Sequence, residues 1–447
     1  MSKTDNVRTI TAFRPLARFV GVSIRDLLVT GGPLVILIII AICAAYWYMR
    51  PAPPDLITIS SGPPGSILRL NAEKYKKILA RNGVKLNILA SEGSLENLKR
   101  LTEPATHVDV AFVQGGLSDG KKIDKLASLG SVFHEPLFVF YRNSSPIRLL
   151  SELQGKRLAI GPEGSGTRAL VMTLLKSNDI EMGGTTSLLE LGGENAAKAL
   201  VDNKVDAVFL MGDSAAPQVI RSLLLNQDIR LLNVAQAEAY VRRLPYLSKL
   251  NLPMGAFDFG KNVPSQDVTL IGPTVELVAR DNLHPALSDM LIEAAQEVHG
   301  GAKLLQHAGE FPAPLEHEYR ISDDARRYYT SGKTFLYRNL PFWVATLVDR
   351  LLVVVVPVIM LLIPGLKLVP AIYAWRIKSR IYRCYGKLIG LERDMLLHPA
   401  AEEKKELVKQ LDEIEADVNK MKIPLAYAEQ FYVLRDHINF VRDRNAS

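Results

Sequence analysis

The sequence predicts an α/β protein with two lobes joined by crossing strands, two membrane-spanning helices and a helical C-terminal segment. Three observations predict this organisation. Strand and helix patterns alternate between residues 56 and 335, an apolar run lies on each side of that region, and apolar residues recur at helical spacing after residue 376. The 447 residues leave room for two or three domains, and 48% of them are hydrophobic.

The first apolar run covers residues 27–49, contains LVILIII at 34–40 and ends in three aromatic residues. It is long enough to cross a hydrocarbon layer of about 30 Å, and the aromatic residues are typical of a membrane interface. A cleaved signal peptide is the alternative, but no A-x-A site precedes Arg50, and Cys43 follows Ile42 where a lipobox has a small residue. We therefore expect a retained transmembrane helix.

The second apolar run predicts a transmembrane helix over residues 341–363, with Asp349 and Arg350 reaching toward one interface. A buried core helix is the alternative. Orientation follows from the basic residues outside the two runs, which are expected to face the cytoplasm: Lys3, Arg8, Arg14, Arg18, Arg25, Lys367, Arg376, Lys378, Arg380, Arg383 and Lys387. Both termini, including residues 1–26, are then cytoplasmic, and residues from about 50 to 340 lie outside.

A proline-rich linker at 50–55 precedes the first α/β series. The expected strands are 56–60, 84–90 and 108–113, with helices at 66–82 and 95–101. Such a series predicts a parallel sheet with helices on both faces. Ligands of open α/β sheets bind outside the carboxyl ends of the strands, so the loops that follow these strands are candidate binding loops.

A second series follows an extended apolar stretch at 135–141. Its expected strands are 157–160, 187–191, 205–210 and 229–232, and its expected helices are 169–177, 195–201 and 215–225. A later apolar stretch at 267–279 returns the chain to the first lobe, before a helix at 285–299. We therefore assign 56–141 and 265–335 to the first lobe and 142–264 to the second, with a hinge that allows closure around a ligand.

The turn GPEGSGTR at residues 161–168 follows an expected strand and begins an expected helix. Small residues there leave backbone N–H groups uncovered at a helix N-terminus, which favours an anion. The turn lacks the Lys of a Walker A loop and the spacing of a nucleophile elbow, so it predicts binding without chemistry. The alternative is a tight turn capped by Ser165 or Thr167.

Four motifs in order carry a family resemblance: LITISSG at 56–62, SEGSLENL at 91–98, VAFVQ at 110–114 and GKRLAIGPEGSGT at 155–167. Together they resemble the TAXI family of TRAP-transporter solute receptors, over roughly residues 56–320. The resemblance implies a type II periplasmic-binding-protein fold in a bacterial inner (plasma) membrane protein. It also implies capture of a small organic anion, such as a dicarboxylate or a glutamate-like amino acid.

The resemblance, with the turn and loops above, assigns a set of ligand-binding residues: Ser61, Gly62, Ser94, Gln114, Gly164, Ser165, Gly166, Thr167, Arg168, Gly212 and Asp213. The chain departs from the family in two respects. Members often carry Tyr shortly after the first glycine loop, where this chain has Ser66 to Arg69. Receptors of this type are released or singly anchored, whereas this chain has two expected spans and a cytoplasmic extension.

The extension, residues 376–447, is expected to form a helical hairpin or coiled coil. Its apolar positions fall on one face of two helices: Ile377, Ile381, Cys384, Leu388, Leu391 and Met395, then Leu407, Leu411, Ile414, Val418 and Met421. A third helix is expected over 425–441. Mixed charges on the exposed face favour packing or homo-oligomerisation over a dedicated signalling module.

The net charge of +7 does not predict nucleic-acid binding, because the excess lies beside the apolar runs and no nucleic-acid motif accompanies it. The two cysteines provide no disulfide framework, the scattered histidines match no metal spacing, and no catalytic triad is anchored. We expect no cofactor and no enzymatic activity. The favoured function is a solute receptor that delivers its ligand to a separate permease; the alternative is a transmembrane sensor signalling through the C-terminal helices.

Overall fold

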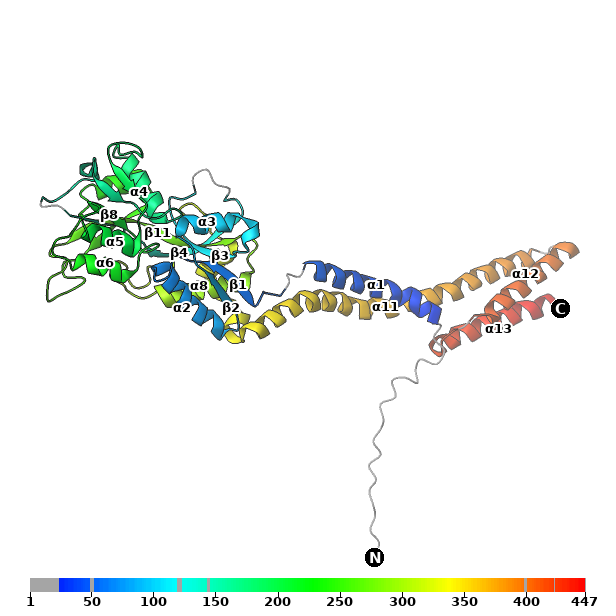
Figure 1. Ribbon diagram of the computed structural model, residues 1–447. Coiled ribbons are helices and arrows are strands. Elements are labelled where there is room, and N and C mark those ends of the chain that lie inside the picture. The colour runs from blue at the N-terminus through cyan, green and yellow to red at the C-terminus, as the bar shows by residue number, and fades with distance from the viewer. Residues whose placement is uncertain are drawn as a thin grey trace, which may run out of the picture. The chain divides into compact units, whose positions relative to one another are not determined.

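The computed structural model describes residues 24–48, 52–118, 123–142, 145–397, 400–421 and 423–446. Most of the expected N-terminal segment 1–26 and the start of the expected linker 50–55 lie outside these residues. The chain divides into two compact units. One contains Met1–Arg50 with Val348–Ser447, and the other contains Pro51–Leu347. The second unit holds every strand of the described residues (Figure 1).

The first sheet of Pro51–Leu347 runs β10 (Leu247–Leu252), β11 (Val268–Arg280), β3 (Val110–Gln114), β1 (Leu56–Ser60) and β2 (Lys85–Leu89), and β4 (Leu126–His134) also pairs with β11. Strand β1 pairs in parallel with β2 and β3, as the alternating pattern predicts. Strand β11 pairs antiparallel with β3, β4 and β10, so the sheet is mixed rather than parallel.

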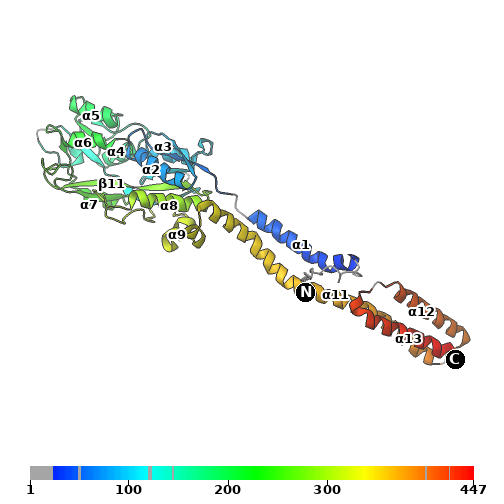
Figure 2. The ribbon, with the colours of Figure 1, turned by 90° about the horizontal axis from the view of Figure 1, so that it is seen from below.

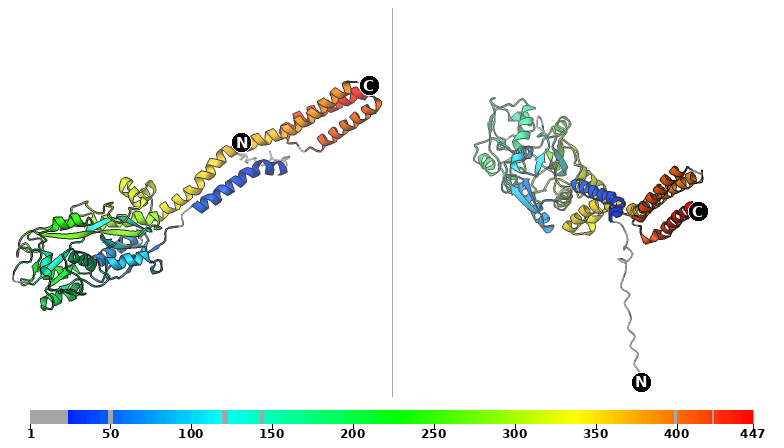
Figure 3. Two further views of the ribbon diagram at one scale, coloured as in Figure 1. Left: turned by 90° about the horizontal axis from the view of Figure 1, so that it is seen from above. Right: turned by 90° about the vertical axis from the view of Figure 1, so that its right-hand side faces the viewer.

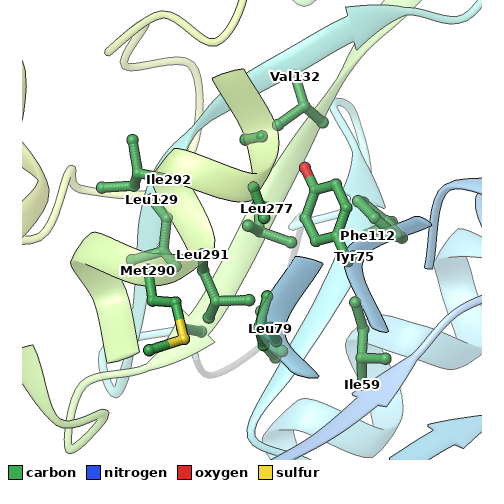
Figure 4. Packing of buried hydrophobic residues seen from close by; sticks show 14 of the residues in the cluster. Ile59, Tyr75, Leu79, Phe112, Leu129, Val132, Leu277, Met290, Leu291 and Ile292 are labelled. Atoms are coloured by element: carbon green, nitrogen blue, oxygen red, sulfur yellow. The ribbon is translucent and has the colours of Figure 1, made fainter. Parts of the chain in front are cut away.

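The helices cover both faces of this sheet because strand residues alternate between them. Helices α2 (Ile67–Arg81) and α8 (Pro285–His299) bury their apolar faces in one core. Figure 4 shows Tyr75 and Leu79 of α2, Met290 to Ile292 of α8 and Phe112 of β3 meeting there. Helix α3 (Ser94–Thr102) covers the opposite face with a smaller cluster. Helices α9 (Asp323–Ser331) and α10 (Phe335–Asn339) follow α8 in the chain.

The second sheet runs β7 (Ser187–Leu189), β6 (Arg157–Ala159), β8 (Ala207–Leu210), β5 (Phe138–Tyr141) and β9 (Arg230–Leu231). The pairs β6–β7 and β6–β8 are parallel, and β5 pairs antiparallel with β8 and β9. One face packs against α4 (Gly166–Lys176) and α7 (Ala237–Arg243), and the other against α5 (Gly193–Val201) and α6 (Pro217–Leu224).

The lobe boundaries expected from the sequence are wrong on both crossing segments. Strand β5 belongs to the second sheet, because Phe138 and Phe140 enter one core of that sheet and Val139 and Tyr141 the other. The first half of β11, residues 268–271, also packs into these two cores. Figure 2 shows β11 as one long strand. The chain therefore crosses between the sheets at 135–137 and 271–273.

The two crossings are joined directly. The N–H of Glu135 donates to the carbonyl oxygen of Pro273 at 2.9 Å, and the N–H of Leu137 donates to that of Ile271 at 2.9 Å. The crossings approach each other closely, because a Cβ on Gly272 would fall 2.8 Å from the Cα of Pro136. Only glycine fits at this position.

The unit of Met1–Arg50 and Val348–Ser447 contains helices but no strand among its described residues. Helix α1 (Ile24–Tyr48) and helix α11 (Phe342–Leu396) are each long and apolar enough to cross a membrane. The expected second span, residues 341–363, lies almost wholly within α11, and the helix expected from residue 376 is part of the same helix rather than a separate one. Helix α11 continues through Pro364 and Pro370, since a proline inside a long helix removes a local hydrogen bond without preventing helix on both sides.

The C-terminal segment forms a three-helix cluster, which includes the third helix expected over residues 425–441. The end of α11 packs with α12 (Ala401–Asn419) and α13 (Ala428–Ala446), which lie side by side in Figure 3. The apolar stripe of α11 predicted from residue 377 to residue 395 is buried here, with Leu411, Ile414 and Val418 of α12. Leu434, Ile438 and Val441 of α13 complete the cluster.

Candidate functional site

The carboxyl edges of the two sheets face each other and are joined by hydrogen bonds. The N–H of Ile67, at the start of α2, donates to the carbonyl oxygen of Gly212 at 2.9 Å, and the N–H of Glu96 in α3 donates to that of Gly164 at 2.9 Å. A side chain makes the third bond, because Gln114 Nε2 donates to the carbonyl oxygen of Gly166 at 3.0 Å. The loops that the sequence singled out therefore meet at one interface.

The N-terminus of α4 holds an anion that belongs to the chain itself. The N–H groups of Gly166 and Thr167 donate to Asp213 Oδ2 at 2.6 and 3.3 Å, and the Thr167 hydroxyl donates to Asp213 Oδ1 at 2.6 Å. Free N–H groups and the helix macrodipole favour a carboxylate at this point. In this structure the carboxyl group of Asp213 occupies the N-terminus of α4, and binding of a separate anion at this turn stays a prediction.

Asp213 is completely buried, and it lies against α4 of the second lobe and the start of α3 of the first lobe. A Cβ on Gly93, at the start of α3, would fall 2.5 Å from Asp213 Oδ2, so the glycine is needed for the close approach. Burial raises the pKa of Asp213 above its ordinary value, and hydrogen bonds from Thr167, Gly166 and Ser214 oppose that increase.

A second carboxyl group, Glu135, lies beside Asp213 at the crossing between the sheets. It is 1% exposed, and neither carboxylate oxygen has a hydrogen-bond partner of normal geometry. Burial, followed by the charge of Asp213, raises the pKa of Glu135 well above its ordinary range, although the backbone N–H of Asp213 acts in the opposite direction. Sequence reasoning missed Glu135. The available signal was one acidic residue inside the apolar stretch 126–141.

Asn97, on α3, is hydrogen-bonded to β1, to β3 and to the loops that follow β1 and β2. Its Nδ2 donates to the carbonyl oxygens of Ser61 at 2.5 Å and Phe112 at 2.9 Å, and its Oδ1 accepts from the hydroxyls of Ser60 at 2.6 Å and Ser91 at 2.7 Å. The side chain is fully buried. Its amide positions the loops after β1 and β2, where Ser61 and Ser94 lie.

Replacing Asn97 by alanine should lower the free energy of unfolding of the strand-containing unit by about 2–4 kcal/mol, because several buried partners lose their hydrogen bonds. Urea titration followed by hydrogen–deuterium exchange mass spectrometry measures the loss in peptides of β1 and β3. The matched control is Asn195→Ala on the exposed face of α5, with an expected change below about 0.5 kcal/mol. Equal effects of the two substitutions would contradict the role assigned to Asn97.

The remaining predicted residues differ in where the structure places them. Ser61 and Gly62 follow β1, and a Cβ on Gly62 would fall 3.0 Å from the backbone oxygen of Asp213. Ser165 caps α4 through its hydroxyl, which accepts from the N–H of Arg168 at 3.1 Å. The Arg168 side chain instead pairs with Glu190 at 2.5 Å. Its charge is therefore directed to β7 and its flanking loop rather than to Asp213.

Comparison with known proteins identifies one family. The profile of the NMT1-like family matches residues 65–297. The solved structures that the chain resembles include a protein of Bordetella bronchiseptica RB50, with 16% identity, coverage of 57% of this chain and 77% of that one, and a TM-score of 0.38. The periplasmic aliphatic sulphonate binding protein SsuA of Escherichia coli has 15% identity, coverage of 55% and 73%, and a TM-score of 0.35. An ancestral arginine-binding protein bound to arginine has 11% identity, coverage of 55% and 92%, and a TM-score of 0.36.

Proposed function

Since the chain belongs to the NMT1-like family, we propose that it is a solute receptor whose two lobes close around a small organic ligand. The observation that carries the proposal is the pattern of contacts between the carboxyl edges of the two sheets. Those edges are joined by the Ile67, Glu96 and Gln114 hydrogen bonds, whereas the covalent connections lie at the crossings 135–137 and 271–273. Breaking a few weak bonds opens the interface, and the crossings act as the hinge.

The strand orders support the finer expectation of a type II binding-protein fold. In each sheet the first strand of its series, β1 or β6, lies between the second and the third, so the order changes direction next to it. Ligands of open α/β sheets bind at such a switch point, outside the carboxyl ends of the strands. The candidate residues Ser61, Ser94, Gln114 and Gly166 follow or face these strand ends. We propose them as ligand contacts, with Gly212 and Asp213 closing the site.

We further propose that the receptor is anchored in a bacterial inner membrane by α1 and α11, with the lobes outside and both termini in the cytoplasm. The two apolar helices and their basic flanks support this topology. The resemblance to TAXI receptors supports a TRAP-type permease as the transport partner, and an organic anion such as a dicarboxylate or a glutamate-like amino acid as the ligand.

A disulfide across the interface tests closure. A Cβ on Gly164 would fall 3.5 Å from the Cβ of Glu96, which is within the range for a disulfide. The variant Glu96→Cys with Gly164→Cys, with Cys43→Ala and Cys384→Ala as background, should close the lobes when oxidised. We expect the oxidised full-length chain in nanodiscs to lose measurable binding of L-glutamate in calorimetry, and reduction to restore it, because exchange requires an open interface.

A second lock and a single-cysteine chain serve as controls. Gly65 and Ala216 also face each other across the interface, with Cβ atoms 3.6 Å apart if Gly65 carried one. The double variant Gly65→Cys with Ala216→Cys should behave like the first lock, and Gly164→Cys alone should respond to neither oxidant nor reductant. Unchanged binding in both locked chains would refute closure as the mechanism of capture.

The alternative function is a transmembrane sensor, and the length of α11 favours it. One uninterrupted helix contains Phe342, which packs on the first core, and the residues that enter the C-terminal cluster. Deleting residues 400–446 separates the two functions. Ligand uptake that survives with a permease present supports the receptor, and loss of a ligand-induced transcriptional or motility response supports the sensor.

A further inference from the structure

The interface contains buried polar atoms whose hydrogen-bonding capacity is unused. Glu135, Gln114 and Ser94 are each at most 1% exposed, and among the described residues both Glu135 oxygens, Gln114 Oε1 and Ser94 Oγ have no hydrogen-bond partner of normal geometry. Leaving a buried polar group unsatisfied costs on the order of 1–3 kcal/mol. Groups of this kind are expected to gain a partner when a ligand binds.

These three residues lie near Asp213. The Gln114 amide contacts Gly166, whose N–H donates to Asp213 Oδ2. Ser94 follows Gly93, which approaches the same carboxylate oxygen. Glu135 Oε1 lies 3.2 Å from the position of a Cβ on Gly212, the residue before Asp213. The unsatisfied atoms therefore converge on one small region that already contains two carboxyl groups.

Three arginines near the N-termini of α2 and α4 and in α3 pair with glutamates rather than with Glu135 or Asp213. Arg69 pairs with Glu73 at 2.8 Å, Arg100 with Glu96 at 2.5 Å and Arg168 with Glu190 at 2.5 Å. The region therefore offers acceptors and negative charge. A ligand that satisfies it must bring hydrogen-bond donors and positive charge.

We infer that Glu135, Asp213, Gln114 and Ser94 bind the ammonium group of a small organic ligand. An ammonium group has three N–H donors, which match the acceptors of Glu135, Gln114 and Ser94, while Asp213 supplies further negative charge. This inference rests on the proposed receptor function and narrows its ligand class. A glutamate-like amino acid satisfies the inference and a dicarboxylate does not.

Ligand pairs that differ in the amino group provide the test. The full-length chain in nanodiscs is titrated by calorimetry with L-glutamate against 2-oxoglutarate, and with cadaverine and 5-aminopentanoate against glutarate. The amine-bearing ligand of each set is expected to bind at least about tenfold more tightly, since a hydrogen bond to a charged group is worth about 1.5–3 kcal/mol. Stronger binding of 2-oxoglutarate and glutarate would overturn the inference.

Glu135→Gln should weaken the binding of the amine-bearing ligands at least about tenfold. The chain should still fold, because the amide has nearly the same shape as the carboxyl group and cannot ionise. The matched control is Glu276→Gln, another fully buried glutamate, whose pKa is affected by Ser128 and Glu318 rather than by Asp213, and it should leave all affinities unchanged. Unchanged affinity in Glu135→Gln would overturn the assignment of this residue.

Proton release is an independent readout. The charged group that acts on Glu135 is Asp213, and the groups that act on Asp213 are the Thr167 and Ser214 hydroxyls and the N–H groups of Gly166 and Thr167. The raised pKa of Glu135 means that a cation must expel a proton to bind, so affinity should increase with pH. Binding heats should therefore differ between phosphate and Tris buffers in the natural chain, and less in Glu135→Gln.

The outcomes separate the inference from the proposed function. If 2-oxoglutarate and glutarate bind better than the amine-bearing ligands, the receptor function is supported and the ammonium site is refuted. If KCl alone gives a heat that Glu135→Gln abolishes, the site holds an inorganic cation and the inference also falls. If no ligand of the panel binds and neither disulfide lock has an effect, the receptor function falls with it.

Discussion

Replacing Gly272 by alanine should lower the free energy of unfolding of the strand-containing unit by about 2–3 kcal/mol. The added Cβ would fall onto the carbonyl group of Glu135 and lie 2.8 Å from the Cα of Pro136. These are backbone atoms, and the hydrogen bonds of Glu135 and Leu137 to the β11 segment hold them in place. Relief of the overlap must therefore break the pairing of the two crossings.

The measurement is urea titration of the full-length chain followed by hydrogen–deuterium exchange of peptides from β5 and β11, which reads this region apart from the helices. Gly301→Ala is the matched control, because a Cβ at Gly301 has no atom within 4 Å. It should change stability by less than about 0.5 kcal/mol. A Gly272→Ala chain as stable as this control would show that the two crossings can separate without lowering the free energy of unfolding.

Replacing Glu276 by glutamine should abolish a large part of the pH dependence of stability. Glu276 lies on β11, is completely buried and has a pKa raised to about 8, chiefly by burial and secondarily by Glu318, with the Ser128 hydroxyl opposing. Between about pH 4.5 and 8 the folded chain keeps a proton that the unfolded chain has lost. Stability therefore falls as pH rises through this range, by about 5 kcal/mol at most.

The glutamine variant should match the natural chain near pH 4 and exceed it by several kcal/mol at pH 8–9, since the amide does not ionise. Urea titrations at a series of pH values, read by exchange of β3 and β11 peptides, measure the difference. Glu181→Gln on the surface is the control and should leave the pH profile unchanged. Parallel profiles for the natural chain and Glu276→Gln would show that Glu276 is not buried in the neutral form.

Local pattern predicted most of the elements. The helix expected at 285–299 is α8, and the strand expected at 56–60 is β1, because apolar spacing reports which face of a segment is buried. The same reasoning found the C-terminal stripe from Ile377 to Met395. It could not assign β5 to a sheet, since apolar residues on both sides of a strand are compatible with either core.

At the candidate site, too, the sequence predicted some features and missed others. The glycine-rich turn at 161–168 indicated a helix N-terminus suited to an anion, and the structure contains that arrangement. No local pattern indicated that Asp213, some 46 residues away, supplies the anion to Thr167. For Glu135 the only signal in the sequence was one acidic residue in an apolar stretch, because its burial depends on where the two crossings meet.

The sequence by itself determined most of the helices and strands, although not β4, β10 or α7, that two apolar segments are long enough to cross a membrane, and which face of the C-terminal helices is buried. These properties depend on residues within a few turns or strand positions of one another. The tertiary structure alone decided where the chain crosses between the sheets, which carboxyl group fills the α4 N-terminus, and which buried acceptors remain unsatisfied. Those properties depend on contacts between segments far apart in the chain, where hydrogen-bond geometry and burial select one partner among many of the same chemical type.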